Sequence, residues 1–160
     1  AWAWLPLAVA LPLVPAYAWL GTAGVVPEGF IVLVPIAMLA GGGLAVGNAL
    51  ADLDVDRSAR ASSIAVRLGR WNAWWLHALA LVGAAGLAVV ALPPSQSAAG
   101  PALVLAGTVL LATGVLGAAV AAMPARVAVA RLGWAMEAIG VALIGVGWIL
   151  AYALGRADAG

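Results

Sequence analysis

Five long apolar runs dominate this sequence and restrict the folds that it can adopt. A bilayer core about 30 Å thick requires about 20 mostly apolar residues per helix. Hydrocarbon offers no hydrogen-bond partner to a backbone amide, so runs of this length have to be helical, and they lack the alternation of membrane β-strands. We therefore predict an all-α, polytopic transmembrane helical bundle that forms one domain over residues 1–160. Its helices are expected over residues 2–20, 30–51, 74–92, 101–122 and 132–154.

The composition excludes a soluble domain. Only 8% of the residues are charged and the mean hydropathy is +1.15, whereas a soluble domain carries about 25% charged residues. Cysteine is absent, which excludes disulfides and thiolate metal sites. The chain is rich in Ala and Gly and has no lysine, so that its basic residues are arginines apart from one histidine, a composition associated with GC-rich bacterial genomes. We expect an integral, multi-pass protein of a bacterial plasma membrane, surrounded by bilayer lipid and without a nucleic-acid partner.

The arginines predict the orientation of the bundle. Six of them fall in the second and fourth connections, which lie on the same side of a five-helix bundle: Arg57, Arg60, Arg67, Arg70, Arg126 and Arg131. The other side carries Arg156 next to Asp158. By the positive-inside rule the six-arginine side is cytoplasmic, which places the loop over residues 52–70 in the cytoplasm. Trp71, Trp74 and Trp75 are expected to anchor the third helix at this interface.

A cluster of charge follows the second apolar run, in the stretch NALADLDVDRSAR (residues 48–60). If the helix continues, residues four apart differ by about 40° around its axis, which predicts a stripe of Asn48, Asp52, Asp56 and Arg60. Asp54 would point to the opposite face. Carboxylates one turn apart repel each other, so the stripe needs a partner. Two partners are possible: a following arginine (Arg57 or Arg60), or a divalent cation.

Oxygen ligands, waters and a substrate phosphate are the usual environment of protein-bound Mg²⁺. Asp52 and Asp56 followed by arginine fit a magnesium–diphosphate complex in which the guanidinium group binds free phosphate oxygens. The same pattern also fits a non-catalytic membrane scaffold with Asp/Arg ion pairs at its cytoplasmic face. A third alternative is a transporter or channel fragment in which Asp52, Asp56 and Glu137 line an ion path.

The stretch NALADLDVDRSARASSIAVRLGR resembles the second aspartate-rich motif of the UbiA-type intramembrane prenyltransferases. That pattern reads approximately D-x-x-x-D-x-x-x-G-x-x-[ST]-[LI]-P-x-x-[LF]-G. Asp52 and Asp56 occupy its acidic positions, and Ser63, Ile64, Leu68 and Gly69 match as well. Arg60 stands at the usual Gly and Ala65 at the usual Pro. The preceding stretch LPLAVALPLVPAYAWLG (residues 5–21) also looks like the family's helix before this motif, and the resemblance covers about fifty residues.

The resemblance implies a Mg²⁺-dependent transfer of an isoprenyl group from a prenyl diphosphate to a lipophilic, aromatic or lipid acceptor. It implies that Asp52 and Asp56 bind the metal, and that Asn48, Arg60 and Arg67 contact the diphosphate; no residue is assigned as catalytic. Family members have nine helices and two facing aspartate-rich motifs, and the first motif is not found in this sequence. We therefore expect a C-terminal portion of such an enzyme, inactive without an N-terminal half or a partner chain.

Two ionisable residues fall within the apolar runs. His77 is expected to act as a structural hydrogen-bonding group, and Glu137 to find its partner on another helix. Upstream of the aspartates, Gly41, Gly42, Gly43 and Gly47 predict close helix packing.

Overall fold

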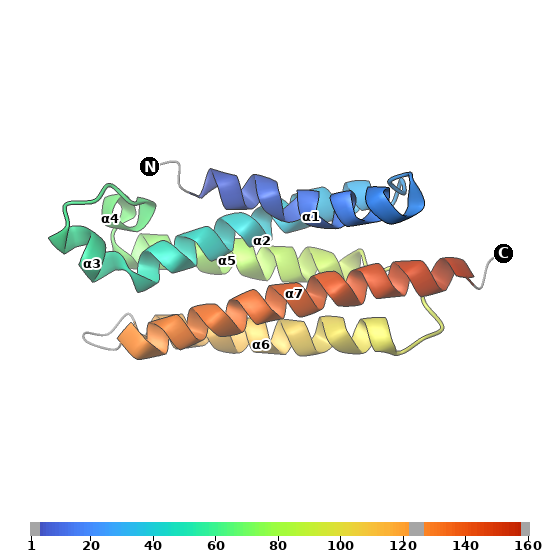
Figure 1. The fold of residues 1–160 in the computed structure, drawn as a ribbon. Coiled ribbons are helices and arrows are strands. Elements are labelled where there is room, and N and C mark those ends of the chain that lie inside the picture. The colour runs from blue at the N-terminus through green and yellow to red at the C-terminus, as the bar shows by residue number, and fades with distance from the viewer. Residues whose placement is uncertain (1–3, 122–126, 158–160) are drawn as a thin grey trace.

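A computed structural model describes residues 4–121 and 127–157, and over these residues it contains helices and no strand. Five long helices run back and forth side by side, and two short ones lie at one end of the bundle (Figure 1). In chain order the helices are α1 (Leu5–Ala23), α2 (Phe30–Ala51), α3 (Leu53–Ser58), α4 (Ile64–Leu68), α5 (Arg70–Val90), α6 (Ala99–Ala121) and α7 (Val127–Ala157). The long helices are each long and apolar enough to cross a membrane, which confirms the predicted polytopic helical bundle.

Two helices begin four or more residues earlier than the apolar runs indicated. α5 begins at Arg70 rather than at Trp74, and α7 begins at Val127 rather than at Leu132. Arginine is a good helix former, so a helix can extend beyond its apolar run. The apolar run marks only the part of the helix that is suited to hydrocarbon. The predicted loop over residues 52–70 contains α3 and α4.

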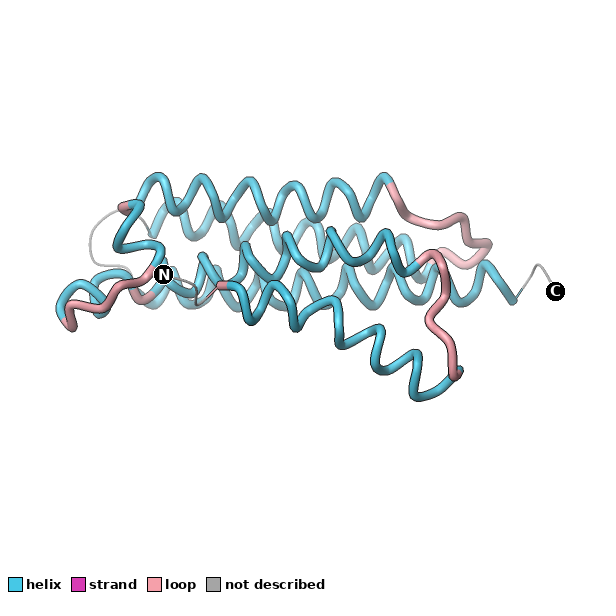
Figure 2. Tube along the Cα trace, turned by 90° about the horizontal axis from the view of Figure 1, so that it is seen from above, coloured by secondary structure: helices cyan, strands magenta, loops and turns pink. Residues whose placement is uncertain are grey.

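The core of the bundle lies between α2, α5, α6 and α7. Small and branched apolar side chains from these four helices form one buried cluster, which includes Leu44, Leu81, Leu111 and Ile144. Helix α1 is peripheral, because Ala8 is its one buried residue. It contains Pro12 and Pro15 within the helix, and Figure 2 shows it diverging from the other long helices toward its C-terminal end.

Glycines spaced seven residues apart hold α6 and α7 in backbone contact. The facing pairs are Gly100 with Gly147, Gly107 with Gly140, and Gly114 with Gly133. A Cβ atom added to Gly107 would stand 2.6 Å from the carbonyl oxygen of Gly140, a distance at which the backbone would have to shift. Small residues allow membrane helices to approach this closely without a hydrophobic driving force between them.

The glycines before the aspartates also pack as predicted. A Cβ atom at Gly41 would lie 2.5 Å from the carbonyl oxygen of Leu7 in α1, and one at Gly43 would lie 2.8 Å from the side chain of Leu81 in α5. A Cβ atom at Gly47 would lie 2.7 Å from the ring of His77 in α5. The glycines of α2 therefore set its distance from both neighbouring helices, and Gly47 makes room for an ionisable side chain.

Candidate functional site

Asp52 and Asp56 remain one helical turn apart although the helix is interrupted at Asp52. α2 ends at Ala51, and Asp52 has φ −99° and ψ 8° between α2 and α3. The helical hydrogen bonds nevertheless continue through the break: the amide of Asp52 donates to the carbonyl of Asn48 (3.1 Å), and the amide of Asp56 donates to that of Asp52 (2.8 Å). Asn48, Asp52 and Asp56 therefore follow one another by helical turns as predicted, with both carboxylates half-buried.

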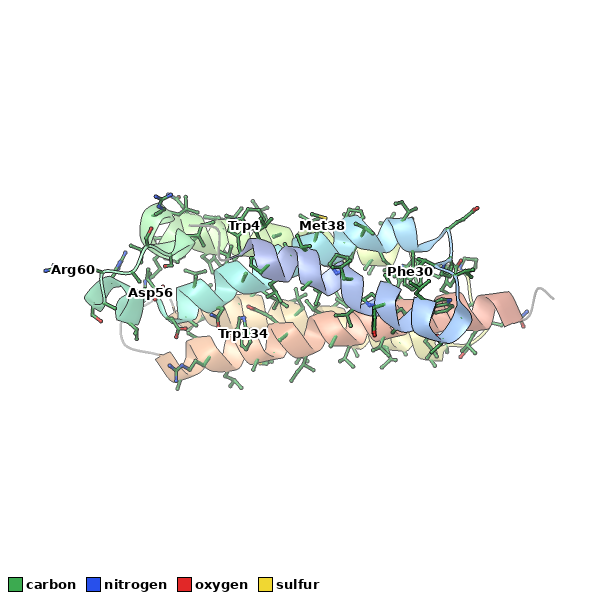
Figure 3. All side chains as sticks on the ribbon, turned by 45° about the horizontal axis from the view of Figure 1, so that its top comes forward. Trp4, Phe30, Met38, Asp56, Arg60 and Trp134 are labelled. Atoms are coloured by element: carbon green, nitrogen blue, oxygen red, sulfur yellow. The ribbon has the colours of Figure 1, made fainter. Side chains whose placement is uncertain are left out.

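Arg60 does not continue this stripe, which corrects the prediction. α3 ends at Ser58, and Arg60 has a φ of 55°, in the left-handed region. The turn is closed by the amide of Ala61, which donates to the carbonyl of Asp56 over 2.8 Å. Figure 3 shows the side chain of Arg60 extending away from the end of the bundle. The helical extrapolation was wrong here because spacing alone does not reveal where a short helix ends.

Arginines from other helices pair with the aspartates. The guanidinium group of Arg131, in α7, lies 3.8 Å from the Asp52 carboxylate. Arg70, at the start of α5, donates to both carboxylate oxygens of Asp54 over 2.9 and 3.1 Å. Arg57 lies 4.0 Å from the same Asp54 carboxylate. Of the stripe, Asp52 thus pairs with an arginine of another helix and not with Arg57 or Arg60, a pairing that residue spacing does not show.

The remaining predicted contact residues lie at the surface of the same end. Asn48 is exposed at the end of α2, and Arg67 is exposed on α4. Arg126 and Asp158 lie outside the described residues. The described arginines of the two connections, from Arg57 to Arg131, gather at the end of the bundle that carries α3 and α4 (Figure 1), as a five-helix bundle requires.

Asp52 and Asp56 can offer two carboxylates to a cation. Over the described parts of the chain, no three side chains among His, Cys, Asp and Glu come close enough together to hold a metal ion. The pair thus supplies two carboxylates and no complete cage. Mg²⁺ is usually bound in this way, by one or two carboxylates, with waters and substrate phosphates completing its octahedron.

A second polar site lies deeper, where α5 and α7 face each other. His77 Nε2 lies 3.0 Å from Glu137 Oε1, and both side chains are buried, at 0% and 1% exposed. His77 Nδ1 lies 2.9 Å from the carbonyl oxygen of Gly43 in α2. The expected partner of Glu137 on another helix is therefore His77. The sequence signal for this pair was that both are ionisable residues within apolar runs.

Two tryptophans extend this polar layer. Trp134 Nε1 donates to the carbonyl of Leu44 in α2 over 3.0 Å, and Trp74 Nε1 donates to that of Val115 in α6 over 3.2 Å. Figure 3 shows Trp134 on the side of α7 that faces the other helices. Trp74 was predicted as an interface anchor and instead ties α5 to α6. Trp71 and Trp75 are exposed, as anchors would be.

A cavity of about 20 Å³ lies beside the deeper site. His77 and Glu137 line it together with Trp74 and Trp134, and Arg70 lines it as well. Because Arg70 also pairs with the exposed Asp54, the cavity lies between the buried pair and the charged end of the bundle.

Comparison with known proteins gives no relative from which a role could be transferred: no family model matches the chain, and neither a curated protein nor a solved structure matches it.

Proposed function

We propose that this chain is part of a UbiA-type intramembrane prenyltransferase, which transfers an isoprenyl group from a prenyl diphosphate to an aromatic or lipid acceptor. One observation carries the proposal. Asp52 and Asp56 lie one turn apart at the end of an apolar helix, and arginines from α5 and α7 reach the same end. Carboxylates for a cation and guanidinium groups for phosphate oxygens are thereby gathered where a lipid-borne diphosphate would meet the aqueous phase.

The proposed roles follow from charge. Asp52 and Asp56 would hold Mg²⁺, which supplies Lewis-acid neutralisation of the diphosphate when bound. Arg131 is 67% exposed, so it can turn from Asp52 to an incoming phosphate and stabilise the charge that develops on the leaving group. Asn48 and Arg67 remain proposed diphosphate contacts. The apolar faces of the long helices would accommodate the prenyl chain.

The local backbone supports the proposal at the positions where the family motif restricts residue type. The motif has glycine at the positions of Arg60 and Gly69, and these residues have φ values of 55° and 75°, which glycine adopts without strain. Its Ser or Thr falls on Ser63, which caps α4 by accepting a hydrogen bond from the amide of Val66. Its proline falls on Ala65 in the first turn of α4, where a proline is tolerated.

The proposal includes a setting in the membrane. The domain would lie in a bacterial plasma membrane with α3 and α4 on the cytoplasmic side, where an excess of arginine is retained. The first aspartate-rich motif would come from a further segment or from a partner chain, and would face Asp52 and Asp56 across the diphosphate.

The test is binding of a prenyl diphosphate, such as geranylgeranyl diphosphate, to the purified chain in lipid nanodiscs, with Mg²⁺ or with EDTA. Loss of a second-shell residue alone weakens a metal site about 10- to 100-fold. Asp52→Asn and Asp56→Asn should therefore weaken Mg²⁺-dependent binding by at least about tenfold.

The matched control for this test is Asp54→Asn. It removes the same charge from a residue of α3 outside the stripe, whose carboxylate pairs with Arg70, and should leave binding within about threefold of wild type, because exposed ion pairs contribute little. Equal binding by all three variants, or binding that is unaffected by EDTA, would show that the diphosphate site is elsewhere or absent.

A further inference from the structure

The buried pair of His77 and Glu137 holds a proton whose position the geometry restricts. A carbonyl oxygen can only accept, so His77 Nδ1 carries a hydrogen and donates it to Gly43 over 2.9 Å. Nε2 then shares one proton with Glu137 Oε1 over 3.0 Å. Either an imidazolium donates to a carboxylate, or a carboxylic acid donates to a neutral imidazole. With one shared proton the pair is neutral overall, which is the state that a low-dielectric interior favours.

A cavity beside the pair has room for a water molecule. Its volume of about 20 Å³ is enough for one water molecule, which needs about 10–15 Å³ and polar partners. Both members of the pair line it, and Ala118 of α6 and Ala130 of α7 keep it open with their small side chains. A Cβ atom at Gly47 would come within 3.3 Å of Glu137 Oε2, so Gly47 also leaves room at the second carboxylate oxygen.

Among the described residues, the helices packed around the pair differ in the charged groups that they bring near it. Arg70 of α5 shares the cavity with the pair and reaches the exposed Asp54. On α7, Arg131 is directed to Asp52 at the surface. α2 and α6 approach the pair with glycines, Gly43 and Gly47 from α2 and Gly114 from α6. The cavity is therefore continuous with one cation, Arg70, at the charged end of the bundle.

We propose that His77 and Glu137 form a proton-binding site, which exchanges its shared proton with water at the Arg70 end through the cavity. Buried ionisable pairs in membrane domains serve as proton relays, and this one combines a carboxylate, an imidazole and space for a bridging water. The site uses neither Asp52 nor Asp56, so it does not depend on the proposed function.

The chain has a single histidine, which makes the experiment unambiguous. Protein labelled with ¹⁵N-histidine in nanodiscs gives the ring nitrogens of His77 alone. We expect Nδ1 to be protonated, and the ring protons to exchange with water in a saturation-transfer measurement. In both states Nε2 shares a proton with Glu137, and the amide of glutamine is a much weaker donor. Glu137→Gln should therefore move the Nε2 signal to that of a neutral imidazole without this shared proton, whereas Glu28→Gln, at the exposed glutamate of the α1–α2 connection, should leave it unchanged. An Nε2 signal that is the same in wild type and Glu137→Gln would overturn the proposal.

The route is tested by filling the cavity. Ala118→Leu should slow exchange of the ring protons with water about tenfold or more, equivalent to about 1.4 kcal/mol in the barrier. Ala112→Leu, on the exposed face of α6, is the matched control and should leave the rate unchanged. Ala130→Val is a second filling variant on another helix, for use if Ala118→Leu does not fold. Ring protons of wild type that do not exchange, or exchange that neither filling variant slows, would make the pair a structural cross-link only.

Discussion

Arg60 has a backbone conformation that suits glycine better than an arginine. Its φ of 55° costs an L-residue roughly 1–2 kcal/mol relative to right-handed backbone, and glycine avoids this cost. Arg60→Gly should therefore stabilise the α3–α4 segment by up to about 1 kcal/mol, after the greater chain entropy of glycine is subtracted. Hydrogen–deuterium exchange of the Ala61 amide, which is bonded to Asp56, measures this directly. Slower exchange is expected.

Arg67→Gly provides the comparison at the same scale. Arg67 is also exposed but lies within α4, where glycine is destabilising by roughly 0.5–1 kcal/mol. It should therefore accelerate amide exchange in its segment. If both arginine-to-glycine variants shift exchange in the same direction, loss of the charge and not the backbone conformation is responsible.

At the scale of the helix, the three glycine pairs between α6 and α7 should dominate the stability of that hairpin. In Gly107→Ala the new methyl group would meet the Gly140 carbonyl oxygen at 2.6 Å, so the helices have to separate. Overpacking of this kind costs about 1–3 kcal/mol. The free energy of unfolding, measured by detergent titration in mixed micelles, should fall by that amount.

Gly145→Ala is the control that separates the effect of packing on stability from the effect of helix propensity. Gly145 is in α7, and a Cβ atom there would meet nothing within 4 Å. Gly145→Ala should raise the free energy of unfolding by up to about 1 kcal/mol, because alanine is the better helix former. A loss of stability in Gly145→Ala equal to that in Gly107→Ala would exclude close α6–α7 packing as the cause.

At the scale of the whole molecule, the side of the membrane on which α3 and α4 lie is open to direct measurement. The chain lacks cysteine, so a single introduced cysteine is the one thiol of the protein that a reagent can label. We expect Ser58→Cys in α3 to be protected from an impermeant thiol reagent in intact cells, and Gln96→Cys in the α5–α6 connection to react. Both positions are exposed. Labelling of Ser58→Cys alone would reverse the orientation that the arginines predict.

Prediction from the sequence succeeded for the membrane-length helices and for the two helical turns from Asn48 to Asp56. α2 begins and ends at Phe30 and Ala51, as predicted, because its apolar run is bounded by turn residues and by charge. It was wrong at Arg60, which lies beyond the end of a six-residue helix, and incomplete at Trp74, whose side chain turns inward. Both outcomes depend on contacts beyond the reach of local periodicity.

The sequence by itself determined that this chain forms apolar helices, because 66% hydrophobic residues in runs of membrane length leave no other way to satisfy the backbone. It also determined that charge collects at one end. Only the tertiary structure decided which charges meet: Arg131 with Asp52, Arg70 with Asp54, and His77 with Glu137. The physical reason is that these pairs join residues on different helices, 16 to 79 positions apart, and spacing along any one helix does not show how two helices pack against each other.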